Sequence, residues 1–163
     1  WYPFAAKLAQ KGYRALALDF RGYGESGGRK DIALIDRDVT AALDYLRSQG
    51  IDKVFLMGAS MGGTASLMVA AQEDVAGVVT LSAPLEFQGL ALGDIKRVTE
   101  PKLFLAVAGD APAADAAETL FEQATNPRRA IIYQMGSGHG TDLLKKVGPG
   151  AETDILNFLQ ENS

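Results

Sequence analysis

Cysteine is absent from this sequence of 163 residues, and histidine occurs only once, at His139. Without a thiol, the chain can form no disulfide framework, cysteine nucleophile or thiolate metal site. With a single imidazole, a multi-histidine metal site is excluded too, and any imidazole general base must be His139. We therefore expect no metal site.

Long apolar runs and an excess of positive charge are also missing. No stretch approaches the roughly 18 apolar residues that a membrane-spanning helix needs, so no such segment is expected. The formal net charge of -4 argues against a nucleic-acid partner, because binding to a phosphate backbone depends on clustered Lys and Arg. The sequence leaves the oligomeric state open. It does not fix the compartment either; we take the cytoplasm as the default, and any signal peptide would lie before Trp1.

The length and the composition fit one globular domain. A chain of 163 residues can bury a core without disulfide or metal staples. Its 47% hydrophobic and 22% charged residues are typical of globular proteins. Because no repeat, low-complexity stretch or linker interrupts it, residues 1–163 are expected to form a single domain.

Apolar strand patterns alternate with helical patterns along the chain. The strand patterns cover residues 13–20, 53–57, 75–81, 102–108 and 130–134. The helical patterns cover residues 3–10, 31–48, 61–71, 116–124 and 152–160. Strands that are apolar throughout and alternate with amphipathic helices indicate a mostly parallel sheet with helices on both faces. The predicted fold class is therefore α/β.

A glycine-rich stretch, RGYGESGG at residues 21–28, matches the spacing G-x-G-x-x-G of dinucleotide-binding loops. Such a loop requires a helix that opens at the third glycine and an acid at the end of the next strand. Here Gly27 is followed by Gly28 and two basic residues, and the next strand pattern ends in Gly-Ala-Ser. No cofactor is therefore expected.

The strongest motif is GASMG, residues 58–62, which lies between a strand pattern and a helix pattern. G-x-S-x-G at such a junction is typical of a nucleophile elbow, a tight turn that exposes the serine hydroxyl above the sheet. Bulky side chains at Gly58 and Gly62 would collide in this turn, and Gly63 lets the helix pack close to the strands. Ser60 is the candidate nucleophile.

On these residues the chain resembles an α/β-hydrolase of the serine carboxylesterase and dienelactone-hydrolase type, and the similarity covers nearly all of it. LALDFRGYGESGG, residues 16–28, resembles the D-x-R-G-x-G-x-S segment after the family's fourth strand, where Asp19 and Arg21 would order the turn. The family's chain order is Ser, then Asp or Glu, then His. The resemblance therefore implies Asp110, after KLFLAVAG, as the acid and His139, in GSGHGTD, as the base.

Asp115 is the alternative to Asp110 as the acid. It lies three residues before Glu118 where a helix is expected to begin, which is the arrangement of an N-cap in a capping box. A capping role would explain the presence of Asp115 without any catalytic role, so Asp110 is favoured as the acid. Met61 is expected to give its backbone N–H to an oxyanion hole, since the residue after the nucleophile supplies one donor.

The sequence departs from the family at its N-terminal side, where the first three strands and a His-Gly-type oxyanion loop are missing. In the family the third strand lies between the fourth and the fifth, so the resemblance predicts a gap between residues 13–20 and 53–57. We expect an N-terminally truncated α/β-hydrolase fold. It should have no lid domain, because only about 17 residues separate LSAP from Lys102.

A serine at the elbow favours acyl transfer, since relatives that cleave carbon–halogen bonds or epoxides use Asp there and dienelactone hydrolases use Cys. The expected function is a serine hydrolase that cleaves small carboxylic esters through a Ser60, His139 and Asp110 triad and an acyl-enzyme. One alternative is an acyltransferase or thioesterase with the same triad. The other is a catalytically inactive fragment or binding protein with this fold, because a second oxyanion donor is missing.

Overall fold

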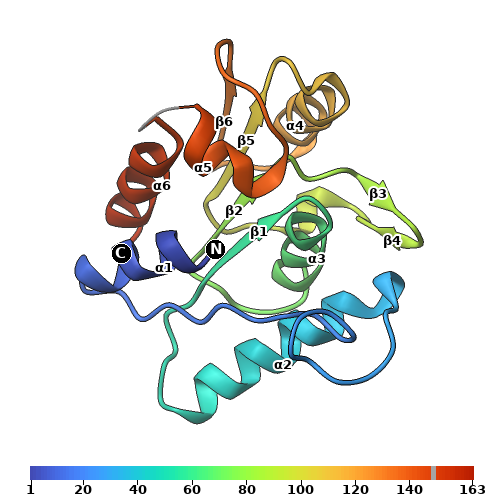
Figure 1. Ribbon diagram of the computed structural model, residues 1–163, viewed down its shortest axis with the longest axis vertical. Helices are drawn as coiled ribbons and strands as arrows, with labels where there is room; N and C mark the ends of the chain where they lie inside the picture. Colours follow the sequence, from blue (N-terminus) through green and yellow to red (C-terminus); the bar gives the residue numbers. More distant parts are fainter. Residues whose placement is uncertain (148–149) are drawn as a thin grey trace.

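The computed structural model describes residues 1–147 and 150–163 (Figure 1). Its main sheet has four strands in the order β1-β2-β5-β6, and each neighbouring pair is parallel. The strands are β1 (Phe55–Ala59), β2 (Gly77–Leu81), β5 (Lys102–Val107) and β6 (Arg128–Tyr133). The predicted α/β class with a parallel sheet is confirmed.

Helices cover both faces of this sheet (Figure 1). One face carries α2 (Ile35–Ser48), α3 (Met61–Ala70) and α4 (Ala111–Gln123). The other face carries α1 (Tyr2–Gln10), α5 (Leu143–Lys146) and α6 (Gly150–Glu161). In the described residues, three short 3-10 turns lie in the connections: Ile32–Leu34, Ile95–Arg97 and Gly140–Asp142.

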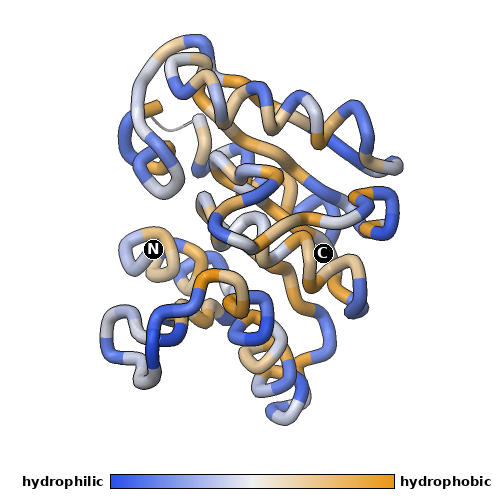
Figure 2. Tube along the Cα trace, turned by 90° about the vertical axis from the view of Figure 1, so that its right-hand side faces the viewer, coloured by the Kyte–Doolittle hydropathy of each residue, from blue (hydrophilic) through white to orange (hydrophobic). Residues whose placement is uncertain are grey.

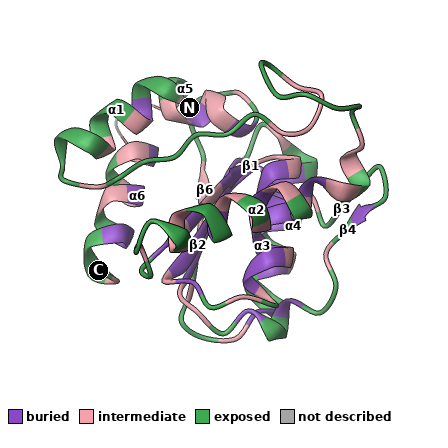
Figure 3. Cartoon of the chain, turned by 90° about the horizontal axis from the view of Figure 1, so that it is seen from below, coloured by how far each residue is buried: buried purple, intermediate pink, exposed green. Residues whose placement is uncertain are grey.

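Alternate residues of the central strands point into two separate hydrophobic cores, because side chains alternate between the faces of a strand. Val78 and Phe104 pack with α2, α3 and α4, whereas Val79 and Leu103 pack with α1, α5 and α6. The central strands β2 and β5 are buried at every position, and Figure 3 shows buried residues gathered in the middle of the molecule. In Figure 2 hydrophilic residues predominate in the outer loops. This burial on both faces explains why the sequences of β2 and β5 are almost entirely apolar.

The connection from β2 to β5 contains a small antiparallel hairpin instead of a helical lid. Its strands are β3 (Glu86–Phe87) and β4 (Leu90–Ala91). Leu90 is fully buried, and Gly89 lies close to Ala33 in the turn before α2. The hairpin therefore rests on the body of the protein beside α3.

Residues 13–20 are the main difference from the predicted elements. The apolar pattern predicts a strand, but no strand forms there, and Leu16 and Leu18 are 45% and 38% exposed. Within the described residues, the backbone of residues 14–18 has no hydrogen-bond partner. A strand requires a neighbour to pair with. The prediction of a strand is wrong because the gap predicted between this segment and β1 leaves it without one.

The start of α4 also differs from the prediction. The helix begins at Ala111, five residues earlier than expected, with Asp110 at its N-cap and Pro112 in its first turn. Proline suits that place because its fixed backbone angle matches the helix and its missing N–H would be unpaired there anyway. Asp115 therefore lies inside the helix, where its carbonyl accepts a 2.8 Å hydrogen bond from Thr119 Oγ1. The interpretation of Asp115 as an N-cap is wrong.

Candidate active site

Ser60 occupies a strained turn between β1 and α3. Its φ is 50° and its ψ is -126°, a backbone conformation that side-chain-bearing residues rarely adopt. The turn is held from both sides: the Ser60 N–H donates to Leu81 O at 2.8 Å, and Ser60 O accepts from Gly63 N at 2.8 Å. Strain of this kind persists only where the surrounding structure enforces it, and it is typical of functional sites.

The glycines around Ser60 are required to different degrees. A Cβ atom at Gly58 would run into the carbonyl group of Gly62, so the turn closes only with glycine there. A Cβ at Gly63 would lie 2.7 Å from Ala83 Cβ, which explains how α3 packs so close to β2. At Gly62 the nearest atom would be 3.4 Å away in the Phe20 ring, an ordinary contact. The predicted steric need for glycine is therefore found at Gly58 and Gly63. At Gly62 a Cβ atom would make an ordinary contact and no clash.

Asp110 lies where β5 ends and α4 begins. Its backbone carbonyl accepts hydrogen bonds from Ala113 N at 3.0 Å and Ala114 N at 2.9 Å, as an N-cap carbonyl does. Its carboxylate makes no capping bond to the helix. The carboxylate is therefore available to a partner outside α4.

His139 lies in the loop after β6, and glycines shape this loop. Gly136, Gly138 and Gly140 have φ values of 102°, 118° and 58°, a region that favours glycine. A Cβ at Gly140 would also lie 3.3 Å from Ala59 Cβ. The lack of a side chain at Gly140 therefore lets the loop approach the elbow closely.

These three residues come together at the carboxyl edge of the sheet. His139 Nε2 lies 2.8 Å from Ser60 Oγ, and His139 Nδ1 lies 2.6 Å from Asp110 Oδ2. A carboxylate only accepts, so Nδ1–H is the donor, and Nε2 is then free to accept the serine hydroxyl proton. The imidazole is 55% exposed and the Asp110 side chain 22% exposed, so the base faces solvent while the acid is partly shielded.

The first turn of α3 presents a backbone donor beside Ser60. Gly63 N and Thr64 N both donate to Ser60 O, at 2.8 and 3.3 Å. Among the described residues, Met61 N–H has no acceptor. Unpaired N–H groups and the helix dipole make this end of α3 favourable for negative charge.

Asp142 is a second carboxylate near His139 that sequence reasoning missed. Its backbone N–H donates to His139 O at 3.2 Å, and Lys146 Nζ donates to its carboxylate at 2.8 Å. The hydrogen bond and charge of Lys146 lower the pKa of Asp142, and the charge of Lys145 adds to this effect. The available signal was its position three residues after the histidine.

The glycine-rich turn at residues 21–28 is tied to α2 rather than to these three residues. Arg21 Nη2 donates to Asp38 Oδ1 at 2.7 Å, and Arg21 N donates to Asp38 Oδ2 at 3.0 Å. Asp19 Oδ2 accepts from Glu25 N at 3.1 Å. These contacts support the interpretation of Asp19 and Arg21 as residues that order the turn.

Within residues 1–147 and 150–163, no group of three His, Asp or Glu side chains is arranged to hold a metal ion. In the same part of the chain, no helix combines the length and the apolar character needed to cross a bilayer.

The sequence profile of one protein family, the alpha/beta hydrolase fold, matches residues 1–125 of this chain. The chain belongs to the alpha/beta hydrolase fold family. A rat relative, Protein ABHD14A, is 26% identical over 140 residues, which are 85% of this chain and 57% of the relative. The chain thus spans 57% and 21% of the lengths of two curated relatives.

Solved structures with this fold include esterases and lipases. The esterase domain of a Rhodothermus marinus protein is 26% identical, with a TM-score of 0.66 over 82% of this α/β-hydrolase and 68% of that chain. A monoacylglycerol lipase of Paleococcus ferrophilus is 15% identical, with a TM-score of 0.80 over 99% of this chain and 88% of the lipase. The second similarity concerns the fold alone.

Proposed function

We propose that this α/β-hydrolase is a serine hydrolase that cleaves small carboxylic esters through an acyl-enzyme. The observation that carries the proposal is the chain of two short contacts from Ser60 through His139 to Asp110, at 2.8 and 2.6 Å. The similarity to an esterase domain supports it further. We also propose that residues 1–163 form one domain, since both cores share one sheet.

In the proposed reaction, Ser60 Oγ attacks the ester carbonyl carbon while His139 Nε2 takes the hydroxyl proton. Asp110 holds the imidazole in the required tautomer and stabilises the imidazolium that forms. The Met61 N–H donates to the oxygen that becomes negative. The leaving alcohol receives the proton from His139, and water then hydrolyses the acyl-serine by the same steps.

Labelling with a fluorophosphonate tests the nucleophile directly. We expect one adduct, mapped by mass spectrometry to Ser60, and none on a Ser60→Ala variant. A Ser48→Ala variant is the control, because Ser48 lies at the far end of α2 and bonds only to neighbours in that helix end. An adduct on another serine of the folded protein would contradict the assignment.

Steady-state assays separate the ester hydrolase from its alternatives. We expect p-nitrophenyl acetate to be hydrolysed by the wild-type chain and not by Ser60→Ala. Equal rates for the two proteins would favour an inactive or binding protein. Faster cleavage of a matched thioester would indicate a thioesterase. Formation of a new ester with an added alcohol, in place of the free acid, would indicate an acyltransferase.

A further inference from the structure

The loop that carries His139 folds back onto the residues that follow it. The N–H of Asp142 donates to His139 O at 3.2 Å. A Cβ atom at Gly136 would lie 2.7 Å from Lys146 O, and one at Gly138 would lie 2.5 Å from Asp142 Cβ. Both distances are too short for a real side chain, so the loop reaches this position only because glycine occupies both sites. Residues 136–139 therefore rest directly on the segment from Asp142 to Lys146.

This segment is anchored at one point and is otherwise short. Leu143 is fully buried and packs in the core on the α1, α5 and α6 face of the sheet. The helix α5 has only four residues, Leu143–Lys146, and isolated helices shorter than about 12 residues are unstable in water. The shape of the segment therefore depends on interactions between its side chains as well as on the burial of Leu143.

One ion pair joins the two ends of the segment. Lys146 Nζ donates to Asp142 Oδ2 at 2.8 Å, and the two side chains are 50% and 45% exposed. An acid four residues before a base is the favourable order for such a pair along a helix. The pair also lies against the loop, since a Cβ atom at Gly138 would lie 3.2 Å from Lys146 Cδ and 3.3 Å from Asp142 Oδ2. The two charged side chains therefore form part of the surface on which the residue before His139 rests.

We propose that the Asp142–Lys146 ion pair positions the His139 imidazole for its two hydrogen bonds. With the pair formed, the loop is held against α5; with the pair broken, the loop can shift, and the imidazole spends less time within reach of Ser60 Oγ. Within the described residues, neither charged side chain is hydrogen-bonded to Ser60 or Asp110, so the pair acts through the loop. Its effect on catalysis rests on the proposed function.

The exposure of the pair sets the size and the kind of effect. An exposed ion pair changes a conformational equilibrium by about two- to fivefold. Dissolved salt weakens it, because both side chains are about half exposed. A displaced base raises the energy of the transition state and not that of the bound substrate, so the change should appear in kcat and not in KM.

Asp142→Asn and Lys146→Gln test the proposal together. We expect each variant to lower the kcat for p-nitrophenyl acetate about two- to fivefold with KM unchanged, and the double variant to be no slower than either one. The wild-type kcat should fall toward that of the variants as NaCl is added, whereas the kcat of the variants should not depend on salt. Lys145→Gln is the matched control, because it removes the same charge one residue away and leaves the pair intact.

The direction of the Lys146 effect separates positioning from a simple effect of charge on the imidazole. If Asp142 acted only through its charge, Asp142→Asn would lower kcat, but Lys146→Gln would leave that carboxylate less neutralised and would raise kcat. If the pair positions the loop, both variants lower kcat. A higher kcat in Lys146→Gln, or an unchanged kcat in both variants, would overturn the proposal.

The imidazole can also be observed without any esterase activity. His139 is the only histidine in the sequence, so the NMR signals of its ring identify themselves. We expect the Nδ1–H proton, which is donated to Asp110, to exchange with water at least twofold faster in Lys146→Gln than in wild type. Faster exchange in a protein that hydrolyses no ester would support the positioning of His139 and contradict the proposed function. Unchanged exchange would overturn the positioning even in a protein that hydrolyses esters.

Discussion

His139 Nε2 lies 2.8 Å from Ser60 Oγ, although 79 residues separate the two in the chain. Each side of this contact is set by backbone geometry: Ser60 by its positive φ in the turn after β1, and His139 by a loop with three glycines at positive φ. The contact therefore depends on how closely two loops approach each other.

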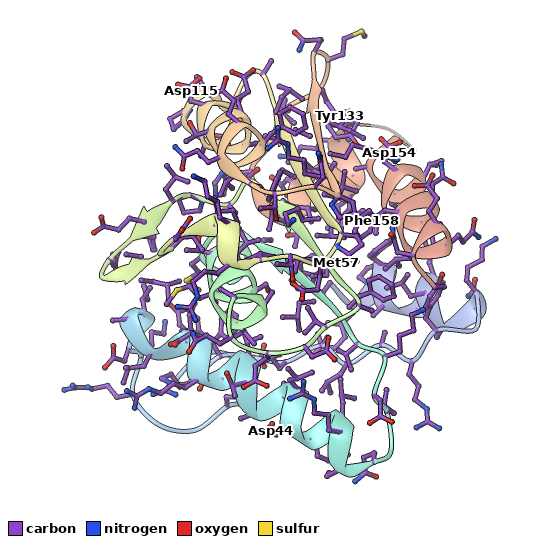
Figure 4. The ribbon with its side chains drawn as sticks, turned by 180° about the vertical axis from the view of Figure 1, so that it is seen from behind. Asp44, Met57, Asp115, Tyr133, Asp154 and Phe158 are labelled. Carbon is purple, nitrogen blue, oxygen red and sulfur yellow. The ribbon has the colours of Figure 1, made fainter. Side chains whose placement is uncertain are left out.

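Asp110→Asn should abolish most of the proposed esterase activity and leave the fold intact. An amide at this position can donate to Nδ1, which stabilises the wrong imidazole tautomer, and a loss of about 10³- to 10⁴-fold in kcat is expected by analogy with serine proteases. Asp115→Asn is the matched control, because Asp115 is exposed on α4 (Figure 4). Steady-state kinetics and circular dichroism provide the check. A loss below tenfold for Asp110→Asn would exclude Asp110 as the acid.

Gly140→Ala tests the geometry of the His139 loop without changing any of the three proposed catalytic side chains. Alanine is strained at a φ of 58°, and its methyl group would press on Ala59 Cβ at 3.3 Å. We expect a loss of about 1 kcal/mol in stability from the backbone alone. We also expect at least a tenfold lower kcat, because the His139 loop is pushed from Ser60. In Gly27→Ala the new methyl group meets nothing within 4 Å, so thermal melts and kinetics of that control should match wild type.

The parts of the fold that the sequence predicts are those whose signals are local. Strands such as β2 and β5 are buried at every position and are apolar apart from Thr80 and Lys102. The elbow around Ser60 is similarly local, since the clash at Gly58 arises within five residues. The contacts of His139 with Ser60 and Asp110 were implied by resemblance alone, because they depend on three loops meeting in space.

The wrong predictions concern features that depend on more than the local pattern of apolar and polar residues. Residues 13–20 have a strand-like sequence, but a strand also needs a hydrogen-bonding neighbour. Asp110 and Asp115 both precede helix-forming residues, and the position of Pro112 decides where α4 begins. The β3 and β4 strands have two residues each, which is too short for any periodic signal.

Tyr133→Phe should weaken the connection between β6 and α6. Tyr133 Oη donates to Asp154 Oδ2 at 2.7 Å, and the two side chains lie near each other in Figure 4. Removing the hydroxyl leaves the Asp154 carboxylate without this donor, with an expected cost of about 1 to 2 kcal/mol. Urea unfolding provides the measurement. Tyr45→Phe is the control, since Tyr45 is 56% exposed and should change stability very little.

The raised pKa of Tyr133 predicts a loss of stability at alkaline pH. Burial, the hydrogen bond to Asp154 and its charge all raise the pKa of Tyr133 above its usual value of 10.0. A raised folded-state pKa means that this contribution is fully present below pH 10 and decreases as the pH rises above it. We expect the free energy of unfolding to fall less steeply above pH 10 in Tyr133→Phe than in wild type. Parallel curves would show that another group causes the alkaline loss.

Asp38→Asn should make the protein less sensitive to acid while lowering its stability at neutral pH. Burial alone raises the pKa of Asp38, but the hydrogen bonds and charge of Arg21 outweigh it, so the pKa lies below its usual 3.8. A lowered pKa gives stability that is present above pH 3.8 and is lost as the pH falls through the folded-state value. Thermal melts from pH 7 to pH 2 should therefore show a smaller acid-induced decrease in Tm for Asp38→Asn than for wild type. Asp44→Asn is the control and should follow the wild-type curve, because Asp44 lies on the same helix but its side chain is 66% exposed. If Asp38→Asn also followed the wild-type curve, the ion pair with Arg21 would not anchor the turn to α2.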